Sequence, residues 1–200
     1  MNPNNPQSAF RIPHLLIIGA GTAGMACAIT AAENGAKVLV IEKLDKIGGT
    51  LFLTGGQMSG GGTRRQLQRN IEDSPENHFA EVMEISRNTA DKALVRLAVD
   101  EAPKTLDWLD ALGLDWDETT PKIIFGHVTY KRPRTHFGIQ KGLSIFNALE
   151  PVWNKYVESG NIEVLLNHKL ESLLVEDGKV IGVVANGKNF FAENTVLATG

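Results

Sequence analysis

The first residues whose types and spacing could do chemistry lie near the N-terminus, where positions 19–24 read Gly-Ala-Gly-Thr-Ala-Gly. In such a G-x-G-x-x-G motif the first glycine permits a tight turn and the second lets backbone N–H groups approach a pyrophosphate; the third lets a helix pack closely on a strand. Glu42 follows about twenty residues on, where a carboxylate can accept hydrogen bonds from the two hydroxyls of an adenosine ribose. Motif and acid together predict a dinucleotide-binding turn, with a purely structural glycine turn as the alternative.

The elements that must position this motif are read from the apolar residues around it. Residues 15–18 form a short apolar run bounded by proline and glycine, as expected of a parallel strand covered on both faces. Residues 22–34 are rich in alanine and carry apolar residues at helical spacing, and Gly35 stands where a helix would end. A second apolar run at 37–41 completes a strand, a helix and a strand, so the chain is predicted to open with a βαβ unit.

Glycine continues to punctuate the chain after the second predicted strand. A nicotinamide-binding domain would lead into another helix and a third parallel strand, whereas this chain leads into Gly-Gly-Thr at 48–50 and Thr-Gly-Gly at 54–56. Backbone amides with no side chain in the way can approach a flavin ring there, donate to its N5 and O4, and stabilise negative charge on the reduced ring. The pattern therefore favours FAD over NAD, and a flexible glycine linker is the alternative.

The remaining pattern divides the chain into segments. Residues 1–12 are predicted to form a disordered tail, 13–62 the βαβ unit with the flavin loop, and 63–142 an insertion of helices and long loop. Residues 143–200 return to the first domain with a helix, a strand, a β-meander that has Asp-Gly and Asn-Gly turns, and a closing strand. The predicted fold class is α/β: a Rossmann-like FAD-binding domain with a parallel sheet and a β-meander, plus a helical insertion.

This order of elements and motifs, with Val-Leu-Ala-Thr-Gly at 196–200, resembles the fumarate reductase and succinate dehydrogenase flavoproteins and their 3-ketosteroid dehydrogenase relatives. The resemblance covers nearly the whole chain and implies FAD as the cofactor. It implies separate groups of residues for the parts of FAD. These are Gly19, Gly21, Thr22, Ala23 and Gly24 for the pyrophosphate; Glu42, Lys43 and Leu170 for the adenosine side; Gly49, Thr50, Thr54, Gly55 and Gly56 for the flavin; and Ala198, Thr199 and Gly200 at the strand end that returns to the cofactor.

The resemblance also implies how FAD is held and which reaction it serves. Covalent members of the family place a histidine in the loop before Gly-Gly, and Gly49 stands at that point, so non-covalent FAD is expected. The implied activity is hydride exchange between flavin N5 and a C–C bond next to a carbonyl or carboxylate of a small molecule, as in fumarate reduction or ketosteroid dehydrogenation. The apolar Thr-Leu-Phe-Leu-Thr at 50–54 points towards a larger or less polar substrate than a small polyanion. Because the family's substrate-clamping residues follow the Ala-Thr-Gly strand, a catalytic or capping domain is expected after residue 200.

The long loop before the helix at 143 holds further candidates for substrate binding or proton transfer, because the family approaches the flavin from the substrate side there. They are His127, Tyr130, Arg132, Arg134 and His136. Tyr130 and His136 are the predicted catalytic residues, and exposed polar loop residues are the alternative interpretation. Cys27, in the alanine-rich helix, is interpreted as a packing residue, and His168 as an ordinary residue at a strand edge.

Composition excludes several classes of protein. The chain of 200 residues has 42% hydrophobic residues and a formal net charge of −3, which gives no electrostatic reason to expect nucleic acid. The short basic cluster at 131–134 is interpreted as a solvated loop. The apolar run at 14–20 is too short for a signal or a membrane span, and the single cysteine fits a reducing compartment, so a cytoplasmic location is expected. No Cys/His cluster has the spacing of a metal site.

Two rival functions stay open at the level of sequence. One is a nicotinamide-binding dehydrogenase, and the other is a flavin-binding fragment without catalysis. The substrate, the direction of reaction, the electron donor or acceptor and the oligomeric state are left undetermined by the residues.

Overall fold

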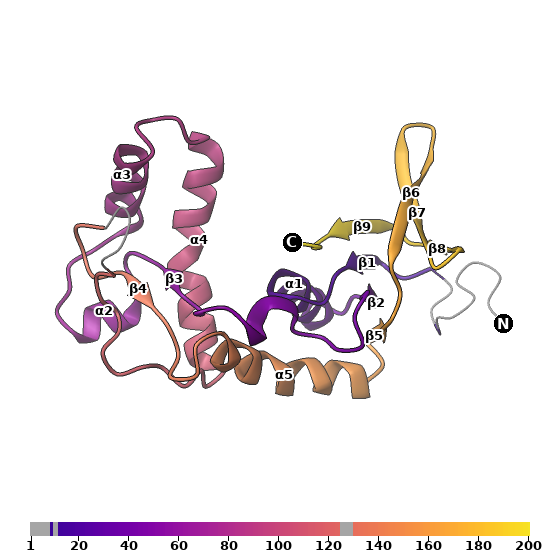
Figure 1. The fold of residues 1–200 in the computed structure, drawn as a ribbon, viewed down its shortest axis with the longest axis horizontal. Coiled ribbons are helices and arrows are strands. Elements are labelled where there is room, and N and C mark those ends of the chain that lie inside the picture. Colours follow the sequence, from indigo (N-terminus) through magenta and orange to yellow (C-terminus); the bar gives the residue numbers. More distant parts are fainter. Residues whose placement is uncertain (1–8, 10–11, 125–129) are drawn as a thin grey trace. The chain divides into compact units, whose positions relative to one another are not determined.

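A computed structural model describes residue 9 and residues 12–124 and 130–200. Two compact units make up the chain, one formed by residues 1–52 and 149–200 and the other by residues 53–148. The first unit is therefore discontinuous in sequence, and the insertion predicted over 63–142 falls within the second. Figure 1 shows the elements of both units.

A four-stranded parallel sheet forms the centre of the first unit. Its strands are β1 (Leu15–Ile18), β2 (Val38–Ile41), β5 (Ile162–Leu165) and β9 (Asn194–Leu197), in the order β5-β2-β1-β9. All four residues of β2 are buried. This agrees with the prediction, from their continuous apolar run, of a strand covered on both faces. Helix α1 (Thr22–Glu33) follows β1 and contacts β1, β2 and β5, so the predicted βαβ unit is present.

A three-stranded antiparallel sheet belongs to the same unit. It consists of β6 (Leu170–Glu176), β7 (Lys179–Ala185) and β8 (Lys188–Phe191). Both of its turns have positive φ at their two central residues, 49° and 75° at Asp177 and Gly178, and 47° and 68° at Asn186 and Gly187. These angles define the type I′ turns that Asp-Gly and Asn-Gly favour, because their twist matches that of the flanking strands.

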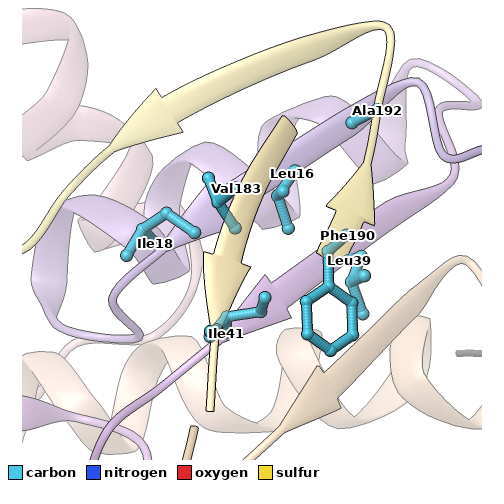
Figure 2. Close-up of a cluster of buried hydrophobic side chains, with 8 residues drawn as sticks. Leu16, Ile18, Leu39, Ile41, Val183, Phe190 and Ala192 are labelled. Carbon is cyan, nitrogen blue, oxygen red and sulfur yellow. The ribbon is translucent and has the colours of Figure 1, made fainter. Parts of the chain in front are cut away.

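One hydrophobic cluster joins the two sheets (Figure 2). Leu16 and Ile18 of β1 and Leu39 and Ile41 of β2 pack against side chains of the antiparallel sheet and of the segment after it. The partners from that side are Val183, Ala185, Phe190 and Ala192. The antiparallel sheet thus supplies the cover that the apolar β1 and β2 require on this face.

The second unit is mainly helical. It contains α2 (Arg64–Gln68), α3 (Pro75–Ile85), α4 (Lys92–Ala111) and the two-stranded sheet of β3 (Met58–Ser59) and β4 (Thr135–His136). Helices α3 and α4 pack side by side. The unit boundary falls within α5 (Gly142–Glu158), and η1 (Gly49–Phe52) closes the first part of the other unit. Each of α2, α3 and α4 begins at a residue whose side chain accepts a first-turn backbone N–H, namely Thr63, Ser74 and Asp91.

A buried charge network in the second unit corrects the interpretation of residues 131–134 as a solvated loop. The Arg134 side chain is fully buried and donates to Asp73 Oδ1 and Oδ2 at 2.8 and 2.9 Å. It also lies 3.1 Å from Glu81 Oε2, and Glu81 accepts from Arg132 and from the backbone N–H of Lys131 as well. Charges taken out of water require such partners, and these partners come from segments distant in sequence, so the local basic pattern did not reveal them.

The observed fold confirms the predicted class, α/β with a parallel sheet, a β-meander and additional helices. Among the residues that the structure describes, no helix combines the length and the apolar character needed to cross a membrane.

Candidate cofactor site

The glycine motif forms the turn between β1 and α1. Gly19 has a φ of +103°, which favours glycine, and its N–H donates to Ile41 O at 2.8 Å. A Cβ at this position would lie only 2.5 Å from the carbonyl oxygen of Ala198, just after β9. The turn is therefore held between the ends of β2 and β9, and the start of the Ala-Thr-Gly segment lies against it.

The other two glycines of the motif differ in their surroundings. A Cβ on Gly24 would lie 1.9 Å from Gly19 O, so close packing of helix on strand requires glycine there. At Gly21 nothing lies within 4 Å of an added Cβ, and its φ of −77° suits any residue. Neither internal packing nor backbone conformation requires a glycine at 21, although glycine is a better N-cap than alanine. A ligand that must approach the backbone closely does explain it, and a pyrophosphate is such a ligand.

The N-terminus of α1 has the features of an anion site. Gly21 is the N-cap and makes no side-chain hydrogen bond to the first turn, which contains no acidic residue. Thr22 and Ala23 are exposed. The first N–H groups of a helix lack partners within the helix and carry its positive dipole end, so they favour a phosphate group.

Glu42 follows β2 and is 6% exposed. Its Oε2 accepts the backbone N–H of Ala20 at 2.7 Å, and its Oε1 accepts that of Leu44 at 2.8 Å. These two bonds fix the carboxylate beside the glycine turn, and each carboxylate oxygen retains a further lone pair for a ribose hydroxyl. The neighbouring Lys43 is exposed.

A cavity of about 190 Å³ opens beside Glu42, within the first unit. Its walls include five of the residues implied for the cofactor: Gly19, Glu42, Lys43, Leu170 and Thr199. The walls also include residues that sequence reasoning did not assign to the site: Ile18, Ile41, His168 and Lys169. The rule that ligands bind at the carboxyl ends of parallel strands could have found the last two, because they lie in the segment after β5.

His168 is more than the ordinary strand-edge residue that the sequence suggested. Its backbone N–H donates to Glu42 O at 2.8 Å, and its Nδ1 donates to Leu166 O at 2.6 Å. A carbonyl oxygen can only accept, so Nδ1 carries a hydrogen. The segment after β5 is thereby hydrogen-bonded to Glu42, the residue that follows β2.

The Gly-Gly-Thr loop packs against the same turn. Gly48 donates to Ala20 O at 2.8 Å, and Gly49 has a φ of +52°. A Cβ on Gly49 would stand 3.2 Å from the Cα of Gly21, which is closer than a side chain normally packs. Thr50, in η1, is exposed. A larger residue at 49 would therefore press on the glycine turn at Gly21.

The Thr-Gly-Gly loop lies in the second unit, where Thr54 O accepts the N–H of Gly142 at 3.2 Å. Gly56 has a φ of +62°, and a Cβ there would lie 2.5 Å from the carbonyl carbon of Lys141. Gly55 is exposed and its added Cβ would meet only the side chain of Gln57, at 3.9 Å. Gly56 thus has a packing reason to be glycine, whereas Gly55 leaves its peptide open to a ligand.

The predicted catalytic residues occupy different surroundings. His136 is fully buried; its Nδ1 donates to Arg134 O at 2.8 Å, and its Nε2 lies 3.1 Å from Thr63 Oγ1. Burial lowers the pKa of His136 to about 4, so its ring is neutral at pH 7. Tyr130 is half-buried and its hydroxyl lies 3.2 Å from His78 Nε2. His127 lies outside the described residues.

His78 shares the surroundings of the buried charge network. Its side chain is 4% exposed, and desolvation, together with the positive charge of Arg134, lowers its pKa to about 4. Cys27 is partly buried in α1, and burial raises the pKa of its thiol, which fits a packing role. The described residues contain no group of three or more His, Cys, Asp or Glu side chains that could hold a metal ion.

These observations fit a dinucleotide. The open position at Gly21, the uncapped N-terminus of α1, the oriented carboxylate of Glu42 and the adjoining cavity all lie in the first unit. They offer one site each for pyrophosphate and ribose and a partly apolar recess for adenine.

Comparison with known proteins gives the class. A family model described as an FAD binding domain matches residues 14–200. The chain is 32% identical over 192 residues to a fumarate reductase (cytochrome) of Shewanella frigidimarina, covering 93% of the chain and 33% of that protein. It resembles the open conformation of a flavocytochrome c3 fumarate reductase with a TM-score of 0.80 and 28% identity, over 94% of the chain and 34% of that structure. A 3-ketosteroid-Δ4-(5α)-dehydrogenase from Rhodococcus jostii RHA1 gives a TM-score of 0.78 at 25% identity, over 100% of the chain and 49% of that structure.

The chain belongs to this family of FAD binding domains. The predicted resemblance to fumarate reductase and ketosteroid dehydrogenase flavoproteins is confirmed, and FAD is the cofactor that the family supports. The chain spans about a third of the length of the curated fumarate reductases that it matches.

Proposed function

We propose that this protein is an FAD-dependent oxidoreductase acting on a C–C bond next to a carbonyl or carboxylate of a small molecule. When bound, FAD supplies reversible hydride exchange at flavin N5. The observation that carries the proposal is the open glycine at 21, beside the fixed carboxylate of Glu42. The named activities of the relatives, fumarate reduction and ketosteroid dehydrogenation, both belong to this reaction class.

The residues of the first unit have positioning roles in this proposal. The backbone N–H groups at Gly21, Thr22 and Ala23 hold the pyrophosphate, where the positive end of α1 favours its charge. Glu42 accepts the ribose hydroxyls, and Lys43 and Leu170 border the adenosine. Gly24 permits the close helix packing on which this geometry depends.

In the proposal, the residues implied for the flavin keep the roles that the resemblance gives them. Those residues are Gly49, Thr50, Thr54, Gly55 and Gly56, and backbone N–H groups at their glycines would stabilise negative charge on the ring. Tyr130 and His136 stay predicted catalytic residues. The neutral ring of His136 and its two hydrogen bonds suit a group that orients β4 and holds a proton at Nδ1.

Non-covalent attachment of FAD is part of the proposal. The sequence has no histidine between Glu42 and Gly56, and the φ of +52° at Gly49 together with the 3.2 Å approach of its added Cβ to Gly21 disfavours a larger side chain at 49. A cytoplasmic location and an electron partner of unknown identity complete the proposal, the location being supported by the single cysteine.

The visible absorption spectrum of the purified protein, before and after acid precipitation, tests the function and the mode of attachment. Flavin bands that pass into the supernatant are expected. Bands that stay with the pellet would contradict non-covalent attachment. Absence of bands after incubation with FAD, together with stabilisation by NAD, would favour the nicotinamide-binding rival.

A further inference from the structure

The second unit contains a cavity that borders the Thr-Gly-Gly loop. Its volume is about 520 Å³, within the range of small-molecule sites. The open peptide of Gly55 forms one wall. The other walls are Gln57, Lys122, Ile123, Ile124, Phe137 and Lys141. No carboxylate lines this cavity among the residues that the structure describes.

Two of the walls are joined to the glycine loop or to β4 by backbone contacts. Lys141, with a φ of +60°, forms the turn whose backbone packs on Gly56, and the next residue donates to Thr54 O. On the other side, Lys122 and Thr135 of β4 exchange two backbone hydrogen bonds of 3.0 and 3.2 Å. The lysines and the glycine loop are therefore held in one framework within this unit.

The two lysines differ in what already surrounds their ammonium groups. Lys122 Nζ donates to Thr119 Oγ1 at 2.9 Å and lies 4.7 Å from the centroid of the Phe137 ring. The neighbouring Asp117 carboxylate accepts from Thr119, and the charge of Lys122 is one cause of its lowered pKa. Lys141 is exposed, and within the described ranges no carboxylate lies within ion-pair distance of it. One cation is thus available to a ligand beside a mainly apolar wall.

We infer that this cavity binds the substrate, and that the substrate is an α,β-unsaturated monocarboxylate with a bulky apolar or aromatic substituent. The inference rests on the proposed function and names its substrate class. Lys141 pairs with the carboxylate, while Ile123, Ile124 and Phe137 contact the substituent. The double bond then lies along the open peptide of Gly55, in the loop implied for the flavin.

Two other substrates of the reaction class fit these walls less well. A small dianion such as fumarate would leave three apolar side chains without contact and would need a second cation, whereas Lys122 is already engaged by Thr119 and Phe137. A neutral steroid would leave the charge of Lys141 without a use. A monoanion with an apolar body satisfies both kinds of wall.

Calorimetric titration of the FAD-loaded protein with cinnamate, fumarate and 4-androstene-3,17-dione tests the inference without relying on turnover. Cinnamate is expected to bind at least about tenfold more tightly than fumarate, because its ring is removed from water. Lys141→Met is expected to raise the Kd for cinnamate about tenfold through loss of a charge-assisted contact, and Lys141→Arg to retain affinity. Lys92→Met, an exposed lysine of α4 outside the cavity, is the matched control and should leave the Kd unchanged.

Tighter binding of fumarate or of the steroid than of cinnamate would overturn the inference, as would equal Kd values for Lys141→Met and Lys92→Met. Turnover of fumarate by a dye-reduced sample in that case would leave the proposed function standing. A sample that takes up no FAD would overturn both the proposed function and the inference that rests on it.

Discussion

Alanine substitutions at two glycines of one turn separate internal packing from cofactor binding. In Gly24→Ala the new Cβ would lie 1.9 Å from Gly19 O, so the helix must shift away from the strand. Overpacking of this kind costs about 1–3 kcal/mol. For a domain of this size each kcal/mol lowers Tm by about 2–4 °C, so we expect a Tm lower by about 2–12 °C.

Gly21→Ala should have the opposite profile. No atom lies within 4 Å of the added Cβ, and the φ of −77° is compatible with alanine. Alanine is the poorer N-cap by up to about 1 kcal/mol, but it lowers the entropy of the unfolded chain, which stabilises by about 0.4–1 kcal/mol. The free energy of unfolding should therefore change little. The methyl group occupies the space that the pyrophosphate needs, and a steric cost of about 1–3 kcal/mol corresponds to a roughly 5- to 150-fold rise in the Kd for FAD.

Circular dichroism melting without added FAD and fluorescence titration with FAD measure the two effects separately. Thr30→Ala, an exposed change on α1 away from the turn, is the matched control. If Gly21→Ala lowered Tm as much as Gly24→Ala, or bound FAD like the unsubstituted protein, the assignment of Gly21 to the pyrophosphate would be refuted.

Three further predictions concern buried polar groups. The pKa of His136 is about 4 in the folded protein against an ordinary value of 6.5, so the unfolded chain binds more protons between these values and the free energy of unfolding should fall as pH drops from 6.5 towards 4. Urea unfolding at several pH values should show a smaller fall in His136→Gln than in the unsubstituted protein, and an unchanged pH slope in that variant would contradict the linkage. Glu42→Gln leaves only one acceptor oxygen for the N–H groups of Ala20 and Leu44, so we expect the free energy of unfolding in urea to fall by about 1–3 kcal/mol and FAD to bind more weakly. An unchanged urea midpoint would show that these two hydrogen bonds do not stabilise the fold. Arg134→Met leaves the buried Asp73 carboxylate without its cation and Glu81 paired with Arg132 alone, which should cost about 3–5 kcal/mol. A loss below about 1 kcal/mol by the same method would argue against the buried network.

Features fixed by neighbouring residues were predictable from the sequence. The Asn186-Gly187 turn follows from the local preference of Asn-Gly for positive φ, and the apolar run of β2 follows from burial on both faces. The glycine motif likewise placed Gly19 and Gly24 in a strand-to-helix turn. In each case the information lies within a few residues of the feature.

Features that depend on distant partners were not predictable. Arg134 sits in a basic cluster typical of an exposed loop, and only the approach of Asp73 and Glu81 from other segments explains its burial. The place of His168 in the cavity depends on the pairing of β5 with β2, so only the general rule about the carboxyl ends of parallel strands, and no local pattern, indicates it. The periodicity of apolar residues indicates helices and strands, but it does not indicate the ion pairs of Arg134 or the pairing of β5 with β2.

The discontinuity of the first unit has a consequence for how the protein is made. Strand β1 pairs on one side with β2, which follows closely in the chain, and on the other with β9, which is synthesised only after the whole second unit. The glycine turn therefore lacks its contact with Ala198 until β9 has been synthesised. Pairing across so long a separation closes slowly, so the nascent chain carries an exposed edge of β1 while the second unit is being synthesised and completes the glycine turn only after β9 has been made.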